Sequence, residues 1–143
     1  MSIIVLGTVA LDTVKTPYGE RKHMLGGSAV HFAMSSRLFT GVNLVAIVGY
    51  DFPARYIDFL NERGINSTSI IKGKSETFKW TGEYKGDLNS AITIRTDLGV
   101  LMEFLPNIPH HQRRIKNLFL ANVDPDIQRH LLESMRSPRL VAL

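Results

Sequence analysis

Four short, uninterrupted apolar runs divide the chain. They cover residues 3–6, 43–48, 118–121 and 140–143. The first two are rich in Ile and Val and end at Gly7 and Gly49. Runs of this kind are typical of strands that are covered on both faces, so they predict a parallel sheet flanked by helices.

Helical spacing of apolar residues predicts three helices between these runs. Residues 28–39 form the first; residues 53–63 form the second, with Asp51 as its expected cap and Gly64 at its end. The third begins with a capping Asp124 and a proline in its first turn. It has one apolar stripe, composed of Ile127, Leu131, Leu132 and Met135. Because strands and helices alternate, the predicted fold class is α/β.

Two segments have a different pattern. Residues 13–24 contain the turn 16–19 and predict a hairpin, and residues 77–98 alternate between apolar and polar positions around a turn at 86–90. Strands of this half-exposed kind predict a small antiparallel β-layer that stands off the α/β body. We therefore expect one domain over residues 1–143, with this layer as an appendage.

Composition narrows the class of protein. Of the 143 residues, 44% are hydrophobic and 21% charged, which is typical of an ordered globular protein. The net charge of +4 suits an anionic ligand such as a nucleotide, but it is too small to indicate nucleic-acid binding. The absence of cysteine excludes disulfides and thiolate metal sites, and it fits a cytoplasmic location. The apolar N-terminus lacks a basic leader, and no run is long enough to predict a membrane span.

Candidate ligand-binding residues follow the predicted strands. Asp12 lies a few residues after the first strand, Gly26 and Gly27 precede the first helix, and Asn122 follows the third apolar run. Ligands of open α/β sheets bind at the carboxyl ends of the strands. A carboxylate, helix-terminal amides and an asparagine suit a ligand with several hydroxyl groups.

Each of these residues also has a structural interpretation. Asp12 could be a turn residue, Asn122 could hydrogen-bond a loop, and glycines before a helix are common. His31, one turn into the first helix, could be a packed or solvated residue. Trp80 and Tyr84 could stack against a ligand ring or pack the β-layer, and the residues leave both alternatives open.

A basic cluster lies outside this group. It contains His110, His111, Arg113, Arg114 and Lys116. Neither a metal site nor a nucleic-acid site is well supported there, so we expect a solvated surface. Asp124 and Asp126 resemble a carboxylate pair, but helix capping accounts for them. The chain contains neither a GxxxxGK[ST] loop nor a GxGxxG turn.

Two long motifs resemble a known family. LGGSAVHFAMSSRLF (residues 25–39) and VNLVAIVGYDFPARYIDFLNERGI (residues 42–65) are similar to the N-terminal half of ribokinase-like (PfkB) carbohydrate kinases. The double glycine that opens a helix and the strand that ends in VG-x-D are the characteristic features. The similarity is strongest over residues 3–65 and extends more loosely to the terminus.

This resemblance implies a ribokinase-like sandwich with a β-lid and transfer of the ATP γ-phosphoryl group to a hydroxyl of a sugar or nucleoside. The implied acceptor-binding residues are Asp12, Gly26, Gly27, Ser28, His31 and Asn122. The implied lid residues are Lys79, Trp80 and Tyr84. The lid would close over the acceptor and exclude water, and it could also pair two subunits into a homodimer.

The chain departs from the family in two ways. His31 stands where ribokinases typically carry asparagine, which leaves the identity of the acceptor open. The family's Gly-Ala-Gly-Asp motif, which holds the catalytic Asp, does not occur. We therefore expect a truncated N-terminal half that contains no catalytic residue, with ATP and Mg²⁺ bound mainly by the other half. The alternative is a non-catalytic sugar- or nucleotide-binding or dimerisation module derived from such a kinase.

Overall fold

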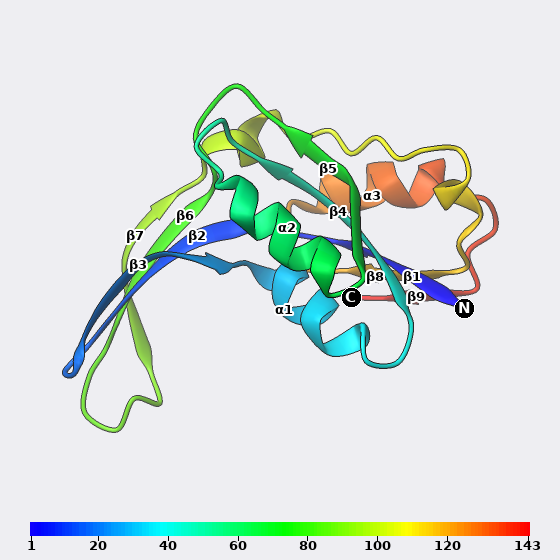
Figure 1. The fold of residues 1–143 in the computed structure, drawn as a ribbon. Helices are drawn as coiled ribbons and strands as arrows, with labels where there is room; N and C mark the ends of the chain where they lie inside the picture. Colours follow the sequence, from blue (N-terminus) through cyan, green and yellow to red (C-terminus); the bar gives the residue numbers. More distant parts are fainter.

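A five-stranded parallel sheet forms the body of the protein (Figure 1). The computed structural model describes residues 1–143. The strand order is β5-β4-β1-β8-β9, and every neighbouring pair is parallel. The strands are β1 (Ser2–Leu6), β4 (Gly41–Val48), β5 (Ile65–Lys72), β8 (Asn117–Leu120) and β9 (Leu140–Ala142). The predicted α/β class is confirmed.

Helices cover both faces of this sheet. Helices α1 (Ser28–Ser36) and α2 (Ala54–Glu62) pack on one face; α3 (Pro125–Ser134) and the short 3₁₀ helix η1 (Gly99–Glu103) pack on the other. A second 3₁₀ turn, η2 (Gln112–Arg114), precedes β8. No helix is long and apolar enough to cross a membrane.

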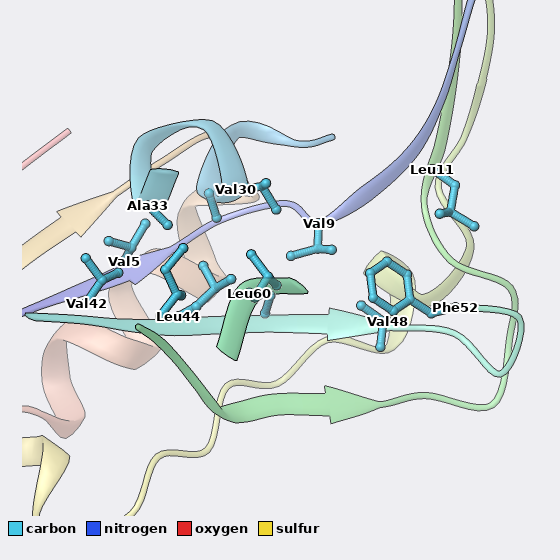
Figure 2. Close-up of a cluster of buried hydrophobic side chains, with 13 residues drawn as sticks. Val5, Val9, Leu11, Val30, Ala33, Val42, Leu44, Val48, Phe52 and Leu60 are labelled. Atoms are coloured by element: carbon cyan, nitrogen blue, oxygen red, sulfur yellow. The ribbon is translucent and has the colours of Figure 1, made fainter. Parts of the chain in front are cut away.

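Alternating residues of the central strand divide the core into two clusters. Val5 packs with Leu44 and Leu60 on the side of α1 and α2 (Figure 2). Ile4 points the other way and packs with Leu131 on the side of α3. All five are completely buried. Both faces of β1 are therefore apolar, which is why the strand appears as an uninterrupted apolar run in the sequence.

A second, four-stranded sheet stands off the body (Figure 1). Its order is β3-β2-β6-β7. The strands are β2 (Ala10–Thr16), β3 (Gly19–Gly26), β6 (Lys79–Tyr84) and β7 (Ala91–Asp97). Both predicted hairpins form as antiparallel pairs, but β2 and β6 are parallel. The expectation of a purely antiparallel layer is therefore wrong, because the two hairpins leave the body in the same direction.

The helix ends and strand β5 agree with some of the local predictions and differ from others. Asp124 caps α3, since its carboxylate accepts from the amide of Asp126 at 2.8 Å. Asp51 does not cap α2; its carboxylate instead binds Thr77. Helix α1 ends at Ser36, three residues earlier than predicted. Strand β5 was not predicted, because polar residues interrupt its sequence INSTSIIK at the edge of the sheet.

Candidate functional site

The candidate site lies where the second sheet joins the carboxyl edge of the body. Strand β1 ends at Leu6, and only three residues separate it from β2. In this connection Thr8 is tied to the start of α1. Its hydroxyl lies 3.0 Å from that of Ser28 and accepts from the Ser28 amide at 2.9 Å. Ser28 also donates to the carbonyl of Asn122 at 3.3 Å. Ser28 therefore joins three chain segments.

Two consecutive glycines let these segments approach one another. Gly27 has a φ of 99°, and a side chain there would overlap the carbonyl of Thr8. A side chain at Gly26 would overlap the carboxylate of Asp12. Gly27 requires glycine because of its positive φ and the Thr8 backbone, whereas a side chain at Gly26 would force the Asp12 carboxylate to move. The two glycines thus place the start of α1 against Thr8 and Asp12.

Asp12 lies on β2 rather than in a turn. Its register partners are Met24 on β3 and Trp80 on β6, so these three side chains share one face of the second sheet. Burial raises the pKa of the Asp12 carboxyl, and the nearby charge of His31 opposes this effect. No hydrogen bond from the protein contributes to that pKa. The half-buried carboxylate therefore keeps its acceptor capacity for a ligand.

His31 and Asn122 mark the edge of the site. His31 is exposed on the first turn of α1, and Asn122 is exposed directly after β8. Both line a cavity of about 610 Å³, together with Phe32 and Phe119, whose rings stack at 3.6 Å. Asn122 also lines a second cavity of about 490 Å³ with Thr8 and other residues. Asp12 lies in the wall of neither cavity.

The fold was compared with known proteins. A nucleoside kinase from Methanocaldococcus jannaschii, described as an archaeal member of the ribokinase family, has a TM-score of 0.78 at 24% identity and matches 98% of this chain. A ribokinase from Giardia lamblia has the same TM-score at 15% identity over 93% of the chain. The fold is ribokinase-like. The resemblance found in the sequence motifs is thereby confirmed.

A curated relative agrees with this result. The cytidine kinase of Thermococcus kodakarensis is 27% identical over 98% of this chain. The chain spans about half the length of this relative and of the Methanocaldococcus enzyme, and 45% of the Giardia ribokinase. No protein-family model matches the chain.

The three residues that the resemblance implied for a lid all lie in the second sheet, but in different places. Lys79 is the register partner of Leu11, so it lies on the face opposite to Asp12. Its ammonium group pairs with Asp51 at 3.1 Å and with Glu76 at 2.7 Å. The structure therefore gives Lys79 a role in joining the second sheet to the body.

The two aromatic residues remain in the second sheet. Trp80 lies on the Asp12 face; its ring covers Gly82, and its indole N–H donates to Thr93 at 3.2 Å. The packing role considered for Trp80 is thus present. Tyr84, at the end of β6, pairs with Ala91 far along the strand from Asp12.

A polar network at the junction was not predicted from the sequence. The Asp51 carboxylate accepts from both the amide and the hydroxyl of Thr77 at 2.7 Å, and the Thr77 hydroxyl accepts from the amide of Gly49 at 3.0 Å. Burial alone would raise the pKa of Asp51, but the hydrogen bonds from Thr77 and Lys79 lower it overall. The VG-x-D motif was the available signal, and it was assigned to helix capping instead.

Two observations concern where Mg²⁺ and ATP could bind. No group of three or more His, Asp or Glu side chains is placed to hold a metal ion. Side chains added at the two glycines would contact Asp12 and Thr8. The glycines do not belong to a phosphate-binding loop of the P-loop type, because the sequence contains no such motif. The carboxylate, the helix-terminal amides and the asparagine at this junction are groups of the kind that a ligand with several hydroxyls can engage.

Proposed function

We propose that this chain is the acceptor-binding half of an ATP-dependent kinase that phosphorylates a hydroxyl group of a nucleoside or sugar. The observation that supports it is the carboxylate of Asp12. It is half-buried at the junction of lid and body, it has no hydrogen-bond partner in the protein, and it faces the glycines that open α1. A buried carboxylate without partners favours a ligand that donates hydrogen bonds to it.

The acceptor that fits this carboxylate carries a ribose group. Two carboxylate oxygens can accept from two neighbouring hydroxyls, which ribose provides. His31 and Asn122 stand at the edge of the site, where they can donate to a base or to further hydroxyls. The names of similar proteins support this choice: a cytidine kinase, a nucleoside kinase and ribokinases all have acceptors that contain ribose or are named for it.

We propose that the phosphoryl donor and the catalytic base are supplied outside residues 1–143. The described residues contain neither a metal cluster nor a phosphate-binding loop, and the curated relative is about twice as long. The isolated chain should therefore bind an acceptor without phosphorylating it. Appreciable phosphoryl transfer from Mg-ATP by the purified chain would contradict this part of the proposal.

We also propose that the lid pairs two subunits. Strand β7 is an edge strand, and Ile92 and Ile94 on it are about half exposed, at 53% and 51%. An exposed apolar edge strand is a natural site for pairing with another sheet. Sedimentation of the purified chain tests this point. We expect the wild type to be a dimer and the double variant Ile92→Lys/Ile94→Lys to be a monomer. A monomeric wild type would contradict the proposal.

Calorimetric titration of the chain with cytidine and with ribose tests the acceptor site. We expect saturable binding of at least one of them, and a loss of at least tenfold in affinity in Asp12→Asn. The matched control is Asp58→Asn, which removes an exposed carboxylate on α2 and should leave the affinity unchanged. Equal binding by Asp12→Asn and wild type would show that Asp12 does not hold the acceptor.

A further inference from the structure

The largest cavity of the protein, about 670 Å³, lies at the end opposite to the candidate acceptor site. It opens where β1, β8 and β9 begin, near the N-terminus in Figure 1. The five residues of β1 separate it from the connection at Thr8 by roughly 15 Å. Its polar and charged lining residues are Ser2, His111, Arg114, Lys116, Asn117 and Arg139.

The charge around this cavity is entirely basic. The two segments that supply its cations, residues 104–123 and 134–143, contain no Asp or Glu. They carry five of the chain's 17 Lys and Arg residues, so the twelve elsewhere are outnumbered by the 13 acidic residues. These two segments therefore carry a net charge of +5, more than the +4 of the whole chain.

The local structure holds these cations together. Lys116 donates through its ammonium group to the carbonyls of Arg136 and Ser137, both at 3.1 Å. The amide of Arg139 in turn donates to the carbonyl of Lys116 at 2.8 Å. These bonds fix the segment before β9 beside the segment before β8. Lys116 keeps one of its three N–H donors for another partner.

The cations have no counter-charge within the protein. None of the ion pairs in the structure includes Arg114, Lys116 or Arg139, and the guanidinium groups of Arg114 and Arg139 make no hydrogen bond to the protein. Like charges held in one cavity repel one another, so an anion that binds there gains both from its own contacts and from the relief of that repulsion.

We propose that this cavity binds a small molecule that carries a phosphate or diphosphate group, at a site separate from the acceptor site. The guanidinium forks of Arg114 and Arg139 suit paired phosphate oxygens, and the ammonium of Lys116 supplies a fixed positive charge. The volume lies within the range of pockets for small ligands, and the open cavity is lined by nine residues from three short segments rather than spread over an extended basic face.

Calorimetric titration of the 143-residue chain with inorganic pyrophosphate at low salt tests this proposal. We expect saturable binding that weakens at least tenfold in the double variant Arg114→Gln/Arg139→Gln. The control, Arg21→Gln/Lys72→Gln, removes the same charge from exposed residues elsewhere and should retain the affinity within about twofold. Thermal unfolding measures whether each variant is folded. We expect both variants to be folded, because the substituted arginines and lysine are exposed to solvent.

Three outcomes would overturn the proposal. They are the absence of saturable pyrophosphate binding by the wild type, an equal loss of affinity in the control variant, and amide NMR shifts that fall outside Ser2, Asn117 and their neighbours. A single-stranded oligonucleotide provides a further arm. If it displaces pyrophosphate and binds more tightly as its length increases, the surface recognises nucleic acid instead of a small molecule.

Discussion

The carboxylate of Asp12 occupies the space that a side chain at Gly26 would fill. The two residues lie on neighbouring strands of the second sheet, β2 and β3, where that sheet joins the body. The absence of a side chain at Gly26 is therefore what lets Asp12 turn toward the start of α1. The sequence feature shared with ribokinase-like proteins, a double glycine, thus has a definite steric function in this chain.

Replacement of Gly26 by alanine should displace that carboxylate. The added methyl group overlaps Asp12, so we expect the free energy of unfolding to fall by about 1–3 kcal/mol and acceptor affinity to fall at least tenfold. Urea unfolding and calorimetry measure the two effects. Gly41→Ala is the control, because a methyl group there meets its nearest neighbour at an ordinary 3.6 Å. If Gly26→Ala binds the acceptor with wild-type affinity, then Gly26 is not required for acceptor binding.

Trp80 should report occupancy of the site. It is the only tryptophan in the chain and lies on the same lid face as Asp12. We expect its fluorescence to change on titration with the acceptor, because a ligand or a moving lid alters the surroundings of its indole ring. The Asp12→Asn variant should show no change at the same concentrations. Binding detected by calorimetry with constant Trp80 emission would place the acceptor away from this face.

Replacement of Lys79 by methionine should loosen the lid. The variant leaves the partly buried carboxylate of Asp51 without its cation, so we expect a loss of about 1 kcal/mol in unfolding free energy and faster amide exchange in β6. Lys85→Met removes a more exposed pair, with Glu83, and should cost less than about 0.5 kcal/mol. Equal effects of the two substitutions would show that the Lys79 pair does not anchor the lid.

Stability should decrease in acid through Asp51. Burial alone would raise the pKa of this carboxyl, but the hydrogen bonds from Thr77 and Lys79 bring it below the ordinary value of 3.8. A lowered native pKa contributes stability that is complete above the ordinary value of 3.8 and is lost as the pH falls from there through the native pKa. We therefore expect the difference in stability between wild type and Asp51→Asn to shrink below about pH 4. A difference that stays constant from pH 7 to pH 2 would contradict this role.

Ionisation of Asp12 should lower the stability of the protein as the pH rises. Burial raises its pKa, with His31 opposing, so its ionisation costs stability as the pH rises above the ordinary carboxyl value. We expect Asp12→Asn to unfold at a higher temperature than wild type at pH 7, although it binds the acceptor more weakly. Calorimetric melting at pH 7 measures this change. A lower melting temperature would show that the carboxylate has a stabilising partner in the protein.

Some of the fold could be predicted because its causes are local. The runs that became β1, β4 and β8 are covered on both faces, so nearly every position in them is apolar. Asp124 followed by proline caps α3 through contacts within three residues. By contrast, β5 was not predicted because it is an edge strand in which four consecutive polar residues, 66–69, interrupt the apolar pattern.

Part of the candidate site could also be predicted because its sequence signals are local. Asp12, Gly26, Gly27 and Asn122 follow or precede apolar runs, so the carboxyl-edge rule could collect them in advance. His31 was included only because of the family resemblance. Ser28 belongs to the same region, but its hydroxyl is engaged with Thr8 and Asn122. The Asp51–Thr77 pair was missed because 26 residues separate its members, and nothing near either residue marks the other.

By itself, the sequence determined that this protein is an α/β domain with a ribokinase-like double-glycine helix start and two lid hairpins. Only the tertiary structure decided that β2 and β6 are parallel, that Asp12 and Trp80 share a face, and that Lys79 turns away toward Asp51. The reason is strand geometry. Successive side chains point to opposite faces, so the pairing register of two distant strands fixes which side chains meet. That register depends on contacts between segments far apart in the chain, which no local pattern contains.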